Sequence, residues 1–166
     1  RIRVDTEFGA YHTKLGSFSL RGGDENYYYG ASLVLQDSAG YSISTTDTTR
    51  DKDGYERIVF SKQVGVVDET MGVDANFRYA KANSEIDSGF TQADNQVSET
   101  DSEQLTGRIA PRLSLFEGVW EQTLAYSANR STRDTLAFGN SHYVGTIHEV
   151  DWQHTLRPVE RLALVV

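Results

Sequence analysis

Apolar and polar residues alternate over several stretches of this chain. Residues 71–79 place Met71, Val73, Ala75, Phe77 and Tyr79 on one side of an extended backbone, and Gly72, Asp74, Asn76 and Arg78 on the other. Residues 104–115, 119–129 and 143–156 alternate in the same way. A period of two residues is typical of a β-strand with one apolar and one polar face, and no helical stripe fits these positions.

The rest of the chain continues the pattern. Further strands are predicted from about Ile2 to Ala10, from Phe18, from Tyr27 and from Ile58, and another begins near Glu160. Short connections at 22–26, 67–70, 116–118 and 157–160 can each form a tight hairpin. Long polar loops are predicted at about 38–54, 84–103 and 131–142. Residues 1–166 are therefore predicted to form a single all-β segment, an antiparallel up-and-down meander of about eight or nine strands, each 9 to 13 residues long.

Two classes of protein have this pattern. Short turns on one edge of a meander and long loops on the other are typical of a transmembrane β-barrel, or of part of one. The alternative is a soluble or self-associating antiparallel β-sheet module that binds a partner and has no transport activity. Aromatic residues near the strand ends favour the membrane, where they gather at the interfaces; they are Tyr27, Tyr29, Tyr79, Trp120 and Trp152.

The alternation also predicts which side chains share a face. The apolar face, expected to meet lipid or a partner, includes Met71, Val73, Phe77, Leu105, Ile109, Leu113, Trp120, Leu124 and Tyr126. The polar face, expected to line a lumen, includes Asp74, Arg78, Arg108, Arg112 and Glu121. Lys62 is discordant, because it falls among apolar positions of its strand.

Composition narrows the partners. The formal net charge of -8 argues against nucleic acid, which would be repelled, and is compatible with divalent cations. No cysteine is present, so thiol chemistry and thiolate metal sites are excluded. No stretch reaches the roughly 18 apolar residues that a membrane helix needs.

No enzyme is predicted. His148 and His154 share a strand face but lie about 20 Å apart along it, too far to bind one metal ion. Asp151 and His154 lack the nucleophile elbow of a hydrolase. We therefore expect no catalytic residues.

Calcium is the one cofactor that the residues suggest. Asp47, Asp51 and Asp53 lie in the segment TTDTTRDKDGY, where alternating carboxylates followed by glycine resemble part of a calcium loop. The second acidic segment, with Glu85, Asp87, Asp94, Glu99, Asp101 and Glu103, is predicted to be a flexible, solvated loop.

Several segments resemble a known family. GSFSLRGGDENYYYGASLVLQDSAGYS, RDKDGYERIVFSKQVG and VDANFRYAKANSEIDSGF resemble the first barrel strands of TonB-dependent outer-membrane receptors, especially the cobalamin-transporter-like branch. ETDSEQLTGRIAPRLSLFEGVWEQTLAYSANRSTRD and HEVDWQHTL look like the strands that follow. The most recognisable residues are 37–41 with Asp53, Gly54 and Tyr55.

The resemblance implies a function. It points to part of the barrel of a receptor in the bacterial outer membrane that takes up a scarce nutrient, cobalamin-like or siderophore-like. The partners would be outer-membrane lipid and the small-molecule nutrient, with TonB contacted only through a plug domain that the resemblance does not cover. Nine strands are also expected not to close as a monomeric barrel, because the first and last would run parallel, so self-association is expected in water.

Overall fold

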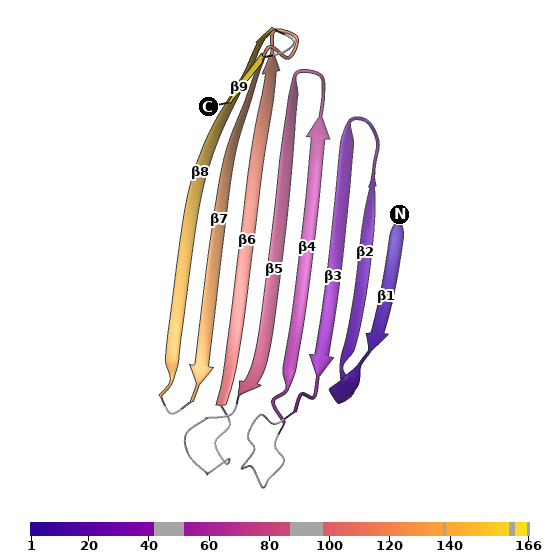
Figure 1. Ribbon diagram of the computed structural model, residues 1–166, viewed down its shortest axis with the longest axis vertical. Helices are drawn as coiled ribbons and strands as arrows, with labels where there is room; N and C mark the ends of the chain where they lie inside the picture. The colour runs from indigo at the N-terminus through magenta and orange to yellow at the C-terminus, as the bar shows by residue number, and fades with distance from the viewer. Residues whose placement is uncertain (42–51, 87–97, 138, 160–161, 166) are drawn as a thin grey trace.

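The computed structural model describes residues 1–41, 52–86, 98–137, 139–159 and 162–165. Nine antiparallel strands follow one another in chain order within a single sheet (Figure 1). The all-β, up-and-down meander predicted from the alternation is therefore confirmed. Among the described residues, no helix has the length and apolar character needed to cross a membrane.

The strands lengthen from β1 to β6, β7 and β8 are of similar length to β6, and β9 is short. Their bounds are β1 Ile2–Phe8, β2 Lys14–Gly23, β3 Tyr27–Ser38, β4 Tyr55–Val67, β5 Met71–Ile86, β6 Ser98–Leu115, β7 Trp120–Leu136, β8 Ser141–Val159 and β9 Leu162–Val165. A 3-10 turn, η1, covers Ala10–His12 between β1 and β2. Ala10 was predicted to continue the first strand, and instead belongs to this turn.

The connections alternate between the two ends of the strands. Strands β2, β4, β6 and β8 end at the upper edge in Figure 1, and β1, β3, β5 and β7 end at the lower edge. We call these the turn edge and the loop edge. The β1–β2 connection is short although it lies at the loop edge, and a hydrogen bond of 2.9 Å from Gly9 N to Thr13 O closes it.

The bounds of two predicted loops are wrong, and residues 87–97 of the first loop lie outside the described residues. Strands β5 and β6 run into the segment 84–103, and β7 and β8 run into 131–142. Glu85 pairs with Glu99, and Asp101 with Asp134, so acidic residues assigned to a solvated loop lie in the sheet. Both faces are polar here, so alternation disappears while the backbone ladder continues. The predicted limit of 13 residues per strand is therefore exceeded, and β8 also includes Arg157, which had been assigned to a turn.

The described residues enclose almost no hydrophobic core. Only Val59, Ala110 and Ala125 are buried apolar side chains. The accessible surface is 12307 Å², against about 8000 Å² for a compact monomer of this length. A sheet of this kind needs something else to cover its apolar side chains.

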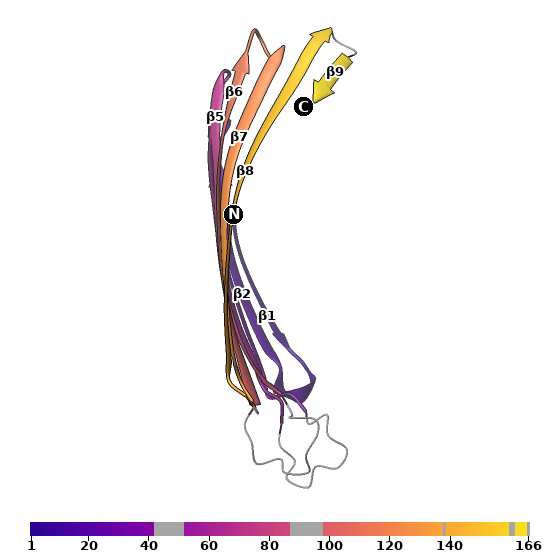
Figure 2. The same cartoon turned by 90° about the vertical axis from the view of Figure 1, so that its left-hand side faces the viewer.

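The sheet is open and bowed. In the described residues β1 pairs only with β2, and β9 only with β8, and the two ends of the sheet lie on opposite sides in Figure 1. Figure 2 shows the sheet edge-on, with the upper and lower ends of the strands bent toward the same side.

Candidate functional site

The register of the strands separates the side chains into two faces. One row of paired residues runs Leu20, Ala31, Lys62, Phe77, Gly107, Ala128 and His148 across β2 to β8. Every residue predicted to face lipid or a partner lies on the face of this row, the apolar face. Asp74, Arg78, Arg108, Arg112 and Glu121 lie on the opposite, polar face. The predicted sorting of side chains between the two faces is confirmed.

Burial indicates which face is concave. The buried residues Val59, Ala110 and Ala125 belong to the polar face. A Cβ added to Gly107 on the apolar face would meet no atom within 4 Å, whereas Gly65 on the polar face lies directly under a tyrosine ring. Side chains converge inside a bowed sheet and diverge outside it, so the polar face is the concave one.

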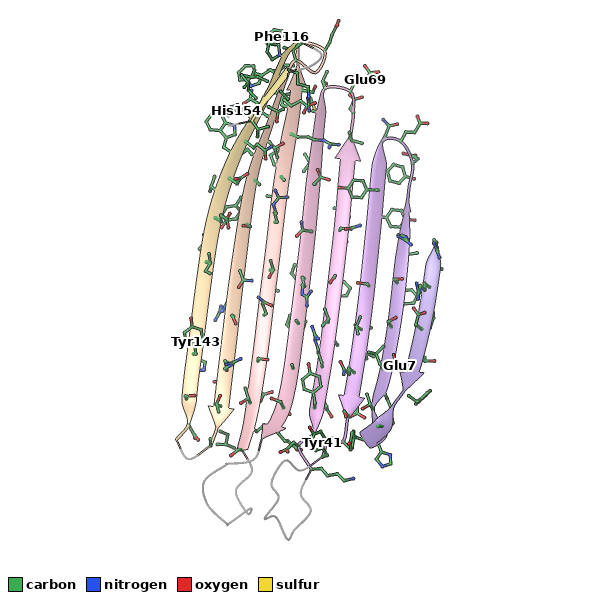
Figure 3. All side chains as sticks on the ribbon, in the orientation of Figure 1. Glu7, Tyr41, Glu69, Phe116, Tyr143 and His154 are labelled. Atoms are coloured by element: carbon green, nitrogen blue, oxygen red, sulfur yellow. The ribbon has the colours of Figure 1, made fainter. Side chains whose placement is uncertain are left out.

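Large apolar side chains on the convex face are uncovered. Met71 is 60% exposed, Trp152 61% and Val150 69%. Each belongs to an alternating apolar stretch. These stretches span Tyr27–Leu35 on β3, Ile58–Val66 on β4, Met71–Tyr79 on β5, Leu105–Leu115 on β6, Trp120–Ala128 on β7 and Val144–Leu156 on β8. We call these stretches together the apolar band. Toward the loop edge the same face of β6 and β7 becomes polar and carries residues such as Glu99, Asp101 and Asp134. On β8, His154 lies toward the turn edge and Tyr143 toward the loop edge (Figure 3).

The apolar band crosses the strands at a slant. At its loop-side border, the row that contains Leu35 on β3 leads to Thr132 on β7. The apolar stretch of β7 starts only at Ala128, four residues further toward the turn edge. At about 3.3 Å per residue and 4.8 Å per strand, this displacement over the four strand steps from β3 to β7 is a slant of roughly 35°. On β8 the apolar stretch reaches back to Val144, which lies in the row of Leu35.

The turn-side border is displaced in the same direction. The row of Tyr27 leads to Pro111 on β6, and the apolar stretch of that strand continues four residues further, to Leu115. This border therefore slants by about 40°. Nine residues at such an angle give the band a height of about 23 Å perpendicular to its borders.

Lys62 interrupts the band. It lies midway along the apolar stretch of β4, with Phe60 and Val64 on either side, and it pairs with Ala31 and Phe77. No ion pair or hydrogen bond of its ammonium group is found within the part of the chain that the structure describes. The discordance seen in the sequence is thus a real exposed cation on an apolar surface.

Aromatic rings and histidines gather on the apolar face of β7 and β8. The Trp120 indole Nε1 donates to His154 Nδ1 at 3.3 Å, and the Trp152 ring lies 4.5 Å from the same imidazole. Tyr126 Oη and His148 Nδ1 lie 2.7 Å apart. Each histidine therefore has its own aromatic partner, and the two do not converge on a common site.

Tyrosine positions agree in part with the prediction for strand ends. Tyr27 begins β3 and stacks with Tyr29 at 6.5 Å, at the turn edge. Tyr79 lies inside β5, because that strand runs on to Ile86. It is nevertheless the last apolar residue of its stretch, so it marks the loop-side border of the band.

Glycines leave room for long side chains to lie flat on the polar face. A Cβ on Gly30 would lie 3.2 Å from Gln63 Cγ, and one on Gly72 would lie 2.5 Å from Arg112 Nε. Hydroxyl and amide groups fill the neighbouring rows, and Asn129 Nδ2 donates to Thr106 Oγ1 at 2.8 Å. The concave surface is therefore polar and low in relief.

The candidate calcium residues fall partly outside the described residues. Asp47 and Asp51 lie there, whereas Asp53 is described and is half-buried. The next residue is held in place, because Gly54 N donates to Glu85 Oε2 at 2.9 Å and Glu85 N donates to Gly54 O at 2.9 Å. Within the described ranges no three acidic or histidine side chains are placed to hold a metal ion, so calcium binding stays a prediction.

Sequence reasoning missed this loop-edge contact and a second one beside it. Tyr11 and Tyr41 approach with ring centroids 5.0 Å apart, and Ala39 N donates to Tyr11 O at 3.1 Å. These residues lie far apart in the sequence, and no motif links them. Only the register of β1 to β3 brings them together.

Comparison of the chain with protein-family models, with curated proteins and with solved structures finds no match. The functional argument therefore depends on the two faces of the sheet and on the residues themselves.

Proposed function

We propose that this chain forms part of the wall of a transmembrane β-barrel in the bacterial outer membrane. The barrel would belong to a TonB-dependent receptor that takes up a scarce, cobalamin-like or siderophore-like nutrient. The apolar face would meet lipid, and the polar face would line the interior.

The slanted apolar band is the observation that carries this proposal. Transmembrane barrel strands tilt by about 35–45° from the membrane normal and present an apolar band about 25 Å tall. A band parallel to the membrane must then cross the hydrogen-bonded rows at the same angle. The slant of 35 to 40° and the height of about 23 Å derived above agree with both requirements. In a soluble sandwich, nothing requires the apolar residues of the inner face to form a slanted band of this height.

The remaining features support the same assignment. Beyond the band, β5 to β7 carry mainly polar residues on both faces toward the loop edge, as expected for strands that project out of a membrane into water. The two tryptophans lie near the turn edge, where an interfacial aromatic belt would be. The receptor family and its nutrient are proposed from the resemblance of the strand and loop residues alone.

One observation is also compatible with the alternative of a self-associating sheet. Among the described residues, β8 pairs with β9 only from Thr155 onward, so its edge from Ser141 to His154 has no partner strand. An unpaired edge of this length is a template for another strand. In a barrel the same edge would be closed by further strands, so this edge is compatible with either function.

Tryptophan quenching by lipid tests the proposal. The chain would be folded into phosphatidylcholine bilayers with or without bromine on the acyl chains. Trp120 and Trp152 are both on the apolar face, so brominated chains should quench their emission strongly. A chain that stays in the aqueous fraction, or whose emission is unaffected by bromine, would contradict a membrane location and favour the soluble sheet.

A matched pair of variants tests the orientation of the faces. In a background without the native tryptophans, Leu105→Trp puts the probe on the apolar face and Thr106→Trp puts it on the polar face one residue away. The first should be quenched by brominated lipid and the second by aqueous iodide. Equal quenching of both by lipid would refute the assignment of the faces.

A further inference from the structure

Positive charge is concentrated on the polar face of β2 to β6. This surface carries the arginines Arg21, Arg57, Arg78, Arg108 and Arg112. Asp74 is its only acidic residue, and it already accepts a hydrogen bond from Tyr28. The surface is therefore strongly positive although the whole chain has a formal net charge of -8.

These arginines have no anionic partner among the described residues. The ion pairs found there are Arg3–Asp5, Lys14–Asp37, His142–Asp134 and Arg157–Glu121, and none involves β4, β5 or β6. Arg108 pairs with Asn76, so Arg78 is its diagonal neighbour on the same face. Two like charges at diagonal positions, about 7 Å apart, repel each other unless an anion lies between them.

Lysine and arginine are divided between the two faces of these strands. Lys14, Lys62 and Lys81 all lie on the apolar face, whereas the cations of the polar face on these strands are arginines. Arginine presents a planar fork of donors that matches a carboxylate or phosphate in a bidentate geometry. A surface built from arginine is suited to binding anions.

The extent of the surface indicates the size of the partner. The row of Arg57 leads to Ser102 on β6, ten residues from Arg112, or about 33 Å along the strand. One small anion cannot reach both ends. Side chains lie flat over Gly30, Gly65 and Gly72, so the surface between the arginines is low in relief and an extended chain can lie across it.

We propose that the polar face of β2 to β6 is a docking surface for an acidic polypeptide, with Arg78 and Arg108 at its centre. Carboxylates of the partner would lie between the arginine forks, and amide and hydroxyl groups such as those of Asn76 and Thr106 would bind its backbone. This inference concerns the face opposite the apolar band, so it holds whether or not lipid covers that band.

Binding of a short acidic peptide tests the proposal. A fluorescein-labelled octaglutamate would be titrated with the full chain in uncharged detergent micelles, and its anisotropy followed at low and at physiological salt. Binding that weakens with salt is expected, with none for octalysine, although the net charge of the chain favours the opposite. Failure of octaglutamate to bind at low salt would overturn the proposal without touching the lipid-quenching result.

Variants locate the site. Arg78→Gln combined with Arg108→Gln should weaken octaglutamate binding about fivefold or more, since each exposed charge pair contributes a factor of up to about five. Arg130→Gln is the control. It removes an arginine from the apolar face of β7, two residues beyond the band, and should leave the affinity unchanged. Circular dichroism of every variant should match the parent chain.

Two results would contradict this location or this partner. Equal weakening by Arg130→Gln would mean that the peptide responds to overall charge and not to the polar face. Displacement of the peptide by inorganic phosphate at equimolar amounts would mean that the arginines form a small-anion site.

Discussion

Tyr28 lies across Gly65 on the polar face, and its hydroxyl donates a hydrogen bond to Asp74 on the next strand. The three residues occupy one row of β3, β4 and β5. A Cβ on Gly65 would lie 2.6 Å from the tyrosine hydroxyl oxygen, and closer still to the ring carbons. Glycine is thus required for the ring to lie flat and reach the third strand.

Gly65→Ala is expected to destabilise the folded chain by about 1 to 3 kcal/mol, because the added methyl group must displace the ring. Urea unfolding in detergent, followed by tryptophan emission, measures this change. Tyr28→Ala in the same chain should remove most of the penalty, giving a clear coupling energy in a double-mutant cycle. Additive effects of the two substitutions would show that the ring does not need the glycine.

Lys62→Leu is expected to stabilise the bilayer-inserted chain by about 2 to 4 kcal/mol, the cost of a lysine at the middle of a lipid-facing strand. The free energy of unfolding from lipid vesicles measures it. Lys81→Leu is the matched control, because Lys81 lies on the same face outside the band, and its effect should be below about 1 kcal/mol. If Lys62→Leu has no larger effect than Lys81→Leu, lipid does not contact this part of the apolar face.

Glu117→Gly is expected to stabilise the β6–β7 turn by about 1 kcal/mol. Phe116 and Glu117 both have a φ of 55°, a left-handed conformation that costs a residue with a Cβ about 1 to 2 kcal/mol. Gly118 has a φ of 88°, so Gly118→Ala in the same turn should have the opposite sign. Thermal unfolding of the two variants in detergent compares them directly, and a lower midpoint for Glu117→Gly than for the parent would contradict the strain.

Calcium at millimolar concentration is expected to bind the acidic segment that ends at Asp53, with heat detectable by calorimetry and slower trypsin cleavage at Arg50. Asp51→Asn combined with Asp53→Asn should abolish both effects, because two of the proposed carboxylate ligands are lost. Glu149→Gln, on the polar face of β8, serves as the control. An absence of heat from the parent chain, together with unchanged cleavage, would contradict the prediction of calcium binding.

Alternation along the chain was sufficient to predict the class of fold and the two faces. Each strand that contains part of the apolar band has a clear period of two, so residues such as Phe77 and Arg78 could be assigned to opposite faces from the sequence. The short connections before Met71 and before Trp120 were also predicted from the sequence as tight hairpin turns. These are local properties, because a strand places successive side chains on opposite sides whatever its neighbours are.

The full length of the strands could not be predicted, because Glu99, Asp101 and Asp134 extend the ladder where both faces are polar. Hydrogen bonds between backbones hold these residues in the sheet, and backbone pairing leaves no signal in the order of side chains. The acidic segment 84–103 was interpreted as a loop for that reason.

By itself, the sequence determined that residues 1–166 form a two-faced antiparallel sheet, because alternation is a property of each strand alone. The slant of the apolar band, the concavity of the polar face and the position of Arg78 beside Arg108 depend on how far each strand is shifted against the next. Register is set by the pairing of each strand with the next and not by the order of side chains within one strand, so only the tertiary structure decided these features.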